Sequence, residues 1–265
     1  MRIALSIAGS DPTGGAGLQL DLQVFRSLGV HGAGVATALT VQDTAKVHQV
    51  LPVFPSVVTD QLRVLLRDIA PHALKLGMLA TDDVVRAVSR GLAELEHPSR
   101  PTPPRVVDPV LLASDGTPLL ERRAWDALGE LIREATLVTP NLPEAEALSG
   151  QDCSDHAGVE RAARRIIQDQ GAQAVLVKGG HAAGRPDDCL ALRGVEGLEI
   201  HWLEGRRIAG GPVHGTGCAL AAAITAGLAR GEALRAAVGH ARAFVALAIE
   251  GAFQAGGGAR LLRLP

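Results

Sequence analysis

Short apolar runs alternate along the chain with amphipathic stretches. The apolar runs predict buried strands at residues 3–8, 34–39, 47–53, 74–76, 105–108, 137–139 and 174–178. Apolar residues that recur every three or four positions, together with two alanine-rich segments, predict helices at residues 17–28, 55–69, 217–230 and 232–251. This alternation predicts a single α/β domain over residues 1–265, with a mostly parallel central sheet flanked by helices.

Local signals sharpen parts of this pattern. Thr81 is a good N-cap, and the helix that it begins directs Val85, Val88, Leu92 and Leu95 inward. The proline-rich stretch 98–104 reads as an exposed connection inside the domain, because strand and helix patterns resume directly after it. Residues 190–192 and 198–203 predict an antiparallel pair of strands near one edge of the sheet.

Composition and charge exclude several classes of function. Net charge is -2 without a basic run, so nucleic acid is not an expected partner. No run reaches the ~20 apolar residues of a membrane span, and the N-terminal apolar run is too short for a signal peptide. Cys153, Cys189 and Cys218 have no paired spacing, which argues against a disulfide framework or a zinc site. We therefore expect a cytoplasmic protein that contacts no membrane.

Unusual residues follow several predicted strands. Ligands of parallel α/β sheets bind outside the carboxyl ends of the strands, so these residues are expected to converge. They are Gly9 to Asp11, Gln42, Gly77 with Met78, Asp108 with Pro109, Asn141, Lys178 to Gly180 and Gly215 to Gly217. The loop at 9–17 is glycine-rich, but it fits neither the dinucleotide fingerprint nor a Walker A loop.

The start of the penultimate helix carries the most informative motif. Gly215, Thr216, Gly217 and Cys218 open a helix whose first amides lack internal partners, and glycines let an anion approach that backbone closely. The segment therefore reads as a phosphate cradle that holds Cys218. The alternative is a tight strand-to-helix turn with a half-buried cysteine.

Other candidate residues also have two interpretations. Asn141 and Glu144 have the spacing of a capping box, but they could instead hold a magnesium ion beside a phosphate. Lys178 could neutralise phosphate charge or pair with a surface acid. Asp21, flanked by leucines, could be solvated or could point into the pocket. Asp108 ends a strand, where a carboxylate is seldom a packing choice.

Seven groups of short motifs, in order, resemble one known family. They lie at residues 7–11 with 14–22, 42–44, 75–79, 107–110 with 114–116, 139–145, 178–181 and 214–218. The chain resembles the ribokinase-like superfamily and, within it, the hydroxymethylpyrimidine/phosphomethylpyrimidine kinases of thiamine biosynthesis. The segments at 209–213 and 256–260 depart from that family's pattern.

The resemblance implies a three-layer fold, usually assembled as a homodimer or higher homo-oligomer, and a two-step reaction. ATP would phosphorylate the hydroxymethyl group of a small-molecule pyrimidine and then the resulting monophosphate. The resemblance also implies a pyrimidine pocket and an anion hole with the catalytic candidate Cys218. For the pyrimidine pocket it implies Gly9, Asp21, Gln42 and Met78, and for the anion hole it implies Gly215, Thr216, Gly217 and Cys218. From their own positions we add Asp108 to the pyrimidine pocket and Lys178 to the catalytic set. We assign Asn141, Lys178 and Thr216 to the nucleotide and Glu144 with Asn141 to Mg²⁺.

Two other functions stay open. A pyridoxal or pyridoxine kinase would use the same architecture on a similar hydroxymethyl ring, although Gln42 and Met78 favour a pyrimidine. A non-catalytic ligand-binding regulator could also have this fold. The intact set at Lys178, Asn141, Glu144 and 215–218 argues against that second possibility, because a silent protein has no chemical need for all of them.

Overall fold

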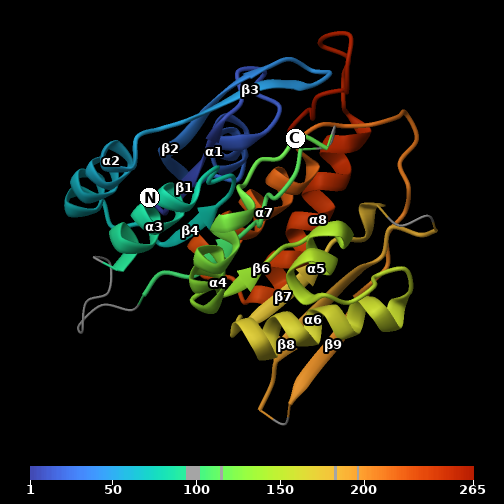
Figure 1. The fold of residues 1–265 in the computed structure, drawn as a ribbon. Helices are drawn as coiled ribbons and strands as arrows, with labels where there is room; N and C mark the ends of the chain where they lie inside the picture. The colour runs from blue at the N-terminus through green and yellow to red at the C-terminus, as the bar shows by residue number, and fades with distance from the viewer. Residues whose placement is uncertain (94–101, 114–115, 182–183, 196) are drawn as a thin grey trace.

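A twisted sheet forms the middle of the molecule in the computed structural model, which describes residues 1–93, 102–113, 116–181, 184–195 and 197–265 (Figure 1). Within these residues the strand order is β3-β2-β1-β4-β5-β6-β7-β8-β9. The strands are β1 Ile3–Ser10, β2 His31–Gln42, β3 Val47–Pro52, β4 Ala73–Leu76, β5 Arg105–Val107, β6 Leu137–Val138, β7 Ala174–Val177, β8 Asp188–Arg193 and β9 Leu198–Leu203. The six from β2 to β7 in that order run parallel, and β3, β8 and β9 are antiparallel to their neighbours.

Helices cover both faces of this sheet and make three layers (Figure 1). One apolar core lies between the sheet and α1, α7 and α8, and the other lies between the sheet and α2, α3, α4, α5 and α6. The helices are α1 Gly17–Ser27, α2 Pro55–Asp68, α3 Asp82–Ala93, α4 Trp125–Arg133, α5 Leu142–Ser149, α6 His156–Gln170, α7 Thr216–Ala229 and α8 Leu234–Glu250. The predicted α/β architecture is thus confirmed.

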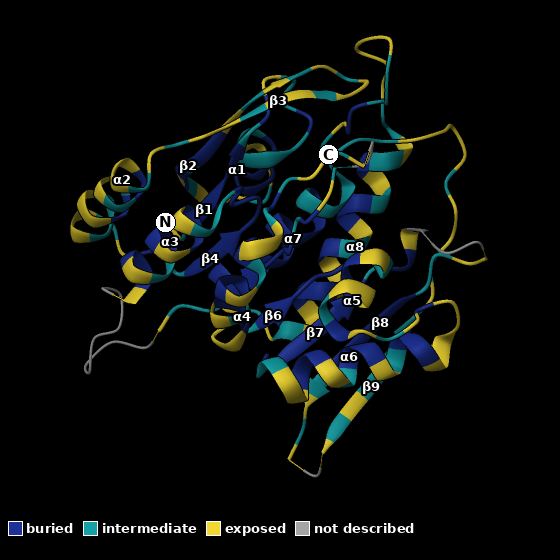
Figure 2. Cartoon of the chain, viewed as in Figure 1, coloured by how far each residue is buried: buried dark blue, intermediate teal, exposed yellow. Residues whose placement is uncertain are grey.

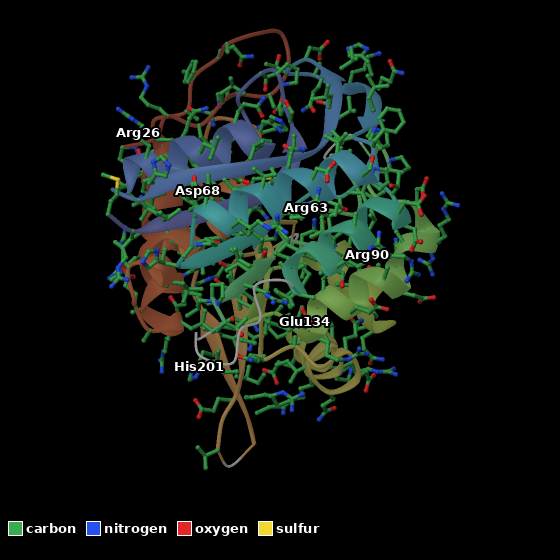
Figure 3. All side chains as sticks on the ribbon, turned by 90° about the vertical axis from the view of Figure 1, so that its left-hand side faces the viewer. Arg26, Arg63, Asp68, Arg90, Glu134 and His201 are labelled. Atoms are coloured by element: carbon green, nitrogen blue, oxygen red, sulfur yellow. The ribbon has the colours of Figure 1, made fainter. Side chains whose placement is uncertain are left out.

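Burial follows the amphipathic pattern of the helices. Figure 2 shows buried residues along the strands and on the helix faces that meet them. Charged side chains such as Arg63 on α2 and Arg90 on α3 lie on the outer face (Figure 3). By contrast, α7 is buried over most of its length because it packs under the sheet between α1 and α8. Within the described residues, no helix has the length and apolarity needed to cross a membrane.

Most predicted elements have nearly the predicted bounds. Strand β2 is longer than expected, because residues up to Gln42 pair with β3 in an antiparallel hairpin. Thr81 accepts the amide of Val84 at 3.3 Å, as expected for an N-cap. Helices α4 and α6 were not among the predicted elements. Leu95, most of the proline-rich stretch and residues 114–115 lie outside the described residues.

Candidate active site

A cavity of about 1270 Å³ lies at the carboxyl ends of the parallel strands, beside the start of α7. It brings together residues of β1, β2 and β4, residues that directly follow β5 and β7, and the start of α7, which are far apart in sequence. Of the site residues predicted from the sequence, those that line it are Gly9, Gln42, Met78, Asp108, Asn141, Glu144, Lys178, Gly215, Thr216, Gly217 and Cys218. The residues that follow the strands therefore converge on one cavity, as expected.

The start of α7 has the geometry of an anion cradle. Its N-cap, Gly215, has a φ of 78°, and a Cβ there would lie 1.8 Å from the carbonyl oxygen of Gly15. Only glycine fits this position. The amides of Thr216, Gly217 and Cys218 fall in the first turn, where no intrahelical acceptor exists, and they add to the positive end of the helix dipole.

Lys178 stands directly beside this helix start. Its Nζ lies 2.7 Å from Oδ1 of Asp108, which also accepts a hydrogen bond from Thr139 Oγ1 at 2.9 Å. A Cβ on Gly217 would lie 3.1 Å from the same Nζ. Burial alone would raise the pKa of Asp108, but the charges of Lys178 and Lys75 outweigh it and lower that pKa. Lys178 thus pairs with an acid, as one alternative held, but that acid is buried in the cavity wall.

Asn141 and Glu144 form the predicted capping box at the start of α5. Asn141 Oδ1 accepts the amide of Glu144 at 2.9 Å, and Glu144 Oε2 accepts the amide of Asn141 at 2.8 Å. Burial raises the pKa of Glu144 to about 7, against the opposing charge of Lys178. A carboxyl group that titrates near neutrality in a cavity wall is a feature of functional sites.

These two side chains also retain the capacity to bind a cation. Each Glu144 oxygen accepts one amide, from Asn141 or from Leu111, which leaves further lone pairs on both oxygens. No cluster of three or more His, Cys, Asp or Glu side chains suited to a metal occurs among the described residues. Magnesium needs only one or two carboxylates when substrate phosphates and water complete its shell, so the residues present fit it.

Cys218 is half-buried in the cavity wall, in the first turn of α7. Burial raises the pKa of its thiol, although the charge of Lys75 acts in the opposite direction. The helix dipole alone would have favoured a thiolate. Desolvation outweighs it here, so Cys218 is a protonated thiol near neutral pH.

Asp21 does not line the cavity, which contradicts the expectation that it contacts the ligand. Its side chain is fully buried, and both carboxylate oxygens face Nζ of Lys75, at 2.7 and 2.9 Å. Ser6 Oγ donates to the same carboxylate at 2.6 Å. Burial disfavours a charge on Lys75, but the carboxylate of Asp21 outweighs this and raises the pKa of Lys75. The two side chains form a buried ion pair at the cavity wall, which Lys75 lines and Asp21 does not. The role of Lys75 in this pair was not predicted.

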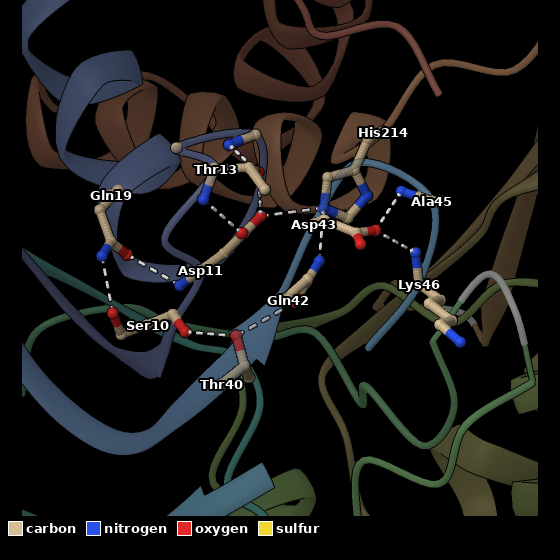
Figure 4. Close-up of polar contacts among 12 residues, drawn as sticks. Ser10, Asp11, Thr13, Gln19, Thr40, Gln42, Asp43, Ala45, Lys46 and His214 are labelled. Atoms are coloured by element: carbon tan, nitrogen blue, oxygen red, sulfur yellow. Dashed lines mark hydrogen bonds and ion pairs between the residues drawn. The ribbon is translucent and has the colours of Figure 1, made fainter. Parts of the chain in front are cut away.

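The opposite wall carries a polar network around Gln42 (Figure 4). Its side-chain amide lies 3.0 Å from Nε2 of His214, and that ring nitrogen lies 2.9 Å from Oδ2 of Asp11. Met78 packs against Gly9 on the adjoining apolar wall, where a Cβ on Gly9 would lie 2.8 Å from the methionine sulfur. This end of the cavity combines an apolar surface with one amide, as a flat heteroaromatic ring requires.

Asp11 was among the residues expected to converge and His214 stood out by its position, but neither was assigned a role in the site. Asp11 lies in the glycine-rich loop at 9–17, and His214 directly precedes the cradle. The sequence signal for both residues was their position next to a motif. That position does not reveal that Asp11 and His214, 203 positions apart, contact each other.

The far end of the cavity is rich in arginines. Arg242 on α8 donates to Asp188 at 2.7 Å and to the carbonyl groups of Leu203 and Glu204, both at 2.9 Å. Asp188 in turn accepts the amide of Gly179 at 2.8 Å. This arrangement orders the turn that follows Lys178. Arginines at 185, 206 and 207 also line this end.

The divergent C-terminal segment closes over the hairpin that carries Gln42. Gly258 donates its amide to Thr44 Oγ1 at 3.0 Å, and Ala259 donates to the Thr44 carbonyl oxygen at 2.8 Å. A Cβ on Gly258 would lie 2.1 Å from that carbonyl oxygen, so a larger residue would displace the contact. Arg260 pairs with Val213, which joins both divergent segments beside the site.

Comparisons with known proteins agree with this geometry. A hydroxymethylpyrimidine/phosphomethylpyrimidine kinase of Staphylococcus aureus is 39% identical over 252 residues, which cover 94% of this chain and 88% of the relative. The phosphomethylpyrimidine kinase structure from Clostridium difficile 630 superposes with a TM-score of 0.80 at 33% identity, covering 94% of this chain and all of that one.

A pyridoxal kinase has a similar fold. The ADP complex of Bacillus subtilis pyridoxal kinase superposes with a TM-score of 0.87 at 31% identity, covering 100% of this chain and 97% of that one. The phosphomethylpyrimidine kinase family model matches residues 11–263, which is nearly the whole chain. The chain therefore belongs to the phosphomethylpyrimidine kinase family.

Proposed function

We propose that this protein transfers the γ-phosphoryl group of ATP to 4-amino-5-hydroxymethyl-2-methylpyrimidine and then to the resulting monophosphate, as one kinase domain over residues 1–265. The observation that carries the proposal is the position of the α7 cradle. On one side His214, which precedes Gly215, lies 3.0 Å from Gln42. On the other side Lys178 lies beside Gly217. The residue after Lys178, Gly179, donates its amide to the Asp188 carboxylate that binds Arg242. A ring bound on the first side and a nucleotide on the second would both meet the cradle.

Phosphoryl transfer depends mainly on positioning and on charge stabilisation. The hydroxymethyl oxygen attacks the γ-phosphorus, the bond to the β–γ bridging oxygen breaks, and ADP leaves. The amides of residues 215–218 would hold the transferring group, and Lys178 would offset its charge. In this arrangement Asp108 holds Lys178 in place, because their contact is 2.7 Å long.

Cys218 is the proposed acceptor of the proton that the hydroxyl group loses. Because burial keeps its pKa high, the thiolate is the minor form near neutrality. Its contribution to the rate should therefore grow as the pH rises. Lys75 lies beneath it and favours the thiolate by its charge.

Nucleotide and metal complete the proposal. Asn141, Lys178 and Thr216 would contact the phosphates of ATP, and Glu144 with Asn141 would hold Mg²⁺ directly or through water. Magnesium would neutralise triphosphate charge when bound. A Glu144 pKa near 7 means that cation binding below this pH must displace a proton.

We also propose that the protein acts in a reducing cytoplasm and that it forms a homodimer. The dimer contact would be the β2–β3 hairpin. Leu39 and Leu51 are cross-strand partners there and are 51% and 43% exposed, and Phe54 after the hairpin is 77% exposed. A contiguous apolar surface of this kind is typical of association sites. Leu39→Asp should then yield monomers in analytical ultracentrifugation, whereas a monomeric unsubstituted protein would refute the dimer.

The decisive experiment measures ADP release by the purified protein with ATP and Mg²⁺. Hydroxymethylpyrimidine, its monophosphate and pyridoxal would be compared as substrates. Lys178→Met, purified identically, excludes a contaminating kinase, and Lys46→Met at an exposed site is the matched lysine control.

Turnover of both pyrimidines is the expected result. Turnover of pyridoxal alone would overturn the substrate assignment and favour the alternative that the fold of the Bacillus enzyme suggests. Tight binding without ADP release would overturn the kinase and favour a regulatory protein.

A further inference from the structure

We propose that His214, held by Asp11, positions the side-chain amide of Gln42 with its oxygen toward the imidazole and its NH₂ group toward the cavity. The site then selects ring ligands that present a hydrogen-bond acceptor at this point. Only the choice of test ligands rests on the proposed function.

Asp11 is fixed as an acceptor by its surroundings (Figure 4). Its carboxylate accepts the Thr13 amide and the Thr13 hydroxyl, both at 2.9 Å, while its own amide donates to Gln19 at 3.0 Å. The side chain is 5% exposed. Burial alone would raise the pKa of Asp11, but the bonds from His214 and Thr13 outweigh it and lower that pKa. The carboxylate is therefore ionised and can only accept hydrogen bonds.

This carboxylate determines where the imidazole carries its proton. Nε2 of His214 lies 2.9 Å from Oδ2 of Asp11. An unprotonated Nε2 would point its lone pair at a negative oxygen, whereas Nε2–H donates to it. His214 consequently presents an N–H group in this direction.

The atom of Gln42 that lies 3.0 Å from this ring nitrogen of His214 is placed in the structure as the amide nitrogen Nε2. With the NH₂ end of the amide facing His214, two donors would meet. The two ends of an amide are nearly equal in shape, so a rotation of about 180° about the Cγ–Cδ bond exchanges them without moving other atoms. With its oxygen toward His214, Gln42 shares the Nε2–H proton with Asp11.

Thr40 requires the same orientation independently. Its Oγ1 lies 3.0 Å from the carbonyl oxygen of Ser10. It also lies 3.2 Å from the other terminal atom of the Gln42 amide, which is placed as the oxygen Oε1. A hydroxyl has a single hydrogen, and the carbonyl can only accept it. Thr40 therefore donates to Ser10 and accepts one N–H from Gln42. The second N–H of Gln42 then remains for the cavity, which this side chain lines.

The free N–H group of Gln42 determines which ring atoms the site can bind well. A ring nitrogen without hydrogen, or a ring oxyanion, satisfies the free N–H of Gln42. A ring C–H or N–H in that place leaves the donor unpaired, which lowers affinity by about 10- to 100-fold. His214 is thus a positioning residue that acts through Gln42.

A double-mutant cycle tests this route. The dissociation constant of hydroxymethylpyrimidine is measured by calorimetry for the unsubstituted protein, His214→Phe, Gln42→Ala and the double variant. We expect His214→Phe to raise it about 10-fold alone, but no more than about twofold in the Gln42→Ala background. His31→Phe is the matched control, because His31 is exposed at the start of β2, the strand that ends at Gln42. An equal factor in both backgrounds would overturn the positioning role.

A second measurement needs no ligand and no activity. Nitrogen-15 NMR of the unsubstituted protein should find the His214 Nε2 atom protonated, with Hε2 bonded to it. A bare Nε2 would overturn the orientation even if the kinase is confirmed. A protonated Nε2 in a protein that phosphorylates no pyrimidine would support the orientation and refute the proposed function.

Thr40 supplies the conservative comparison. Thr40→Ser keeps the hydroxyl and should retain hydroxymethylpyrimidine affinity, while Thr40→Val should weaken binding in the same direction as His214→Phe. Equal affinity in both Thr40 variants would contradict the anchoring of Gln42 by this hydroxyl.

Discussion

Removal of one partner from the buried ion pair of Asp21 and Lys75 should destabilise the protein strongly. In Lys75→Met, the Asp21 carboxylate stays fully buried and keeps only the hydrogen bond from Ser6. An unpaired buried charge of this kind costs about 3–5 kcal/mol of unfolding free energy. For a chain of 265 residues, that corresponds to a fall in Tm on the order of 10 °C.

The double variant separates charge from packing. Asp21→Leu combined with Lys75→Met removes both charges and leaves apolar groups of similar size, so it should recover most of the loss. Urea unfolding and calorimetry of the two single variants and the double variant give the interaction energy. A double variant as unstable as the sum of the singles, or a Lys75→Met variant within about 1 kcal/mol of the unsubstituted protein, would refute the reasoning.

Three further predictions concern the cavity wall. Cys218→Ala should lower kcat about 100-fold with little change in the KM for ATP. It should also remove the rise of kcat toward high pH that the raised pKa of the thiol implies. An unchanged kcat would show that Cys218 takes no part in catalysis. Glu144 titrates at about 7 when folded against 4.5 ordinarily, so the folded state binds more protons between these values and loses stability as the pH rises through them. Glu144→Gln should abolish that loss, which is on the order of 3 kcal/mol, in ligand-free unfolding at pH 5 and 8; a persistent loss would contradict it. Gln42→Ala should raise the KM for pyrimidine more than that for ATP, and equal effects would put Gln42 outside the pyrimidine site.

Features that repeat along the chain were predictable from the sequence. Buried parallel strands read as apolar runs, and their carboxyl ends meet at one edge of the sheet, so the positions of Gln42, Lys178 and Asp108 after such runs were enough to assign them to one site. The capping box of Asn141 and Glu144 depends only on residues three positions apart. The start of α7 was likewise predictable from neighbouring residues, because Gly215 to Cys218 are consecutive in the sequence.

Pairings between distant polar residues were harder to predict. Asp21 among leucines and Lys75 inside an apolar strand are each an anomaly, and each explains the other only when the fold brings them together. The state of Cys218 also depended on tertiary structure, because desolvation competes with the helix dipole and only burial decides between them. Likewise, the contacts of His214 with Asp11 and Gln42 could not be predicted, because no regular sequence spacing links these three residues.

The closure of the site by the two ends of the chain has a consequence for biosynthesis. Asp11 meets His214 from 203 positions away, and Thr44 meets Gly258 from 214 positions away. A ribosome delivers the first half of this site long before the second. Nascent chains must therefore keep β1 and β2 without their α7 partner while the 203 positions that separate Asp11 from His214 are added, and chaperone demand should be greatest in that interval. An arrested chain that lacks α7 would lack the anion cradle, however well its first strands were folded.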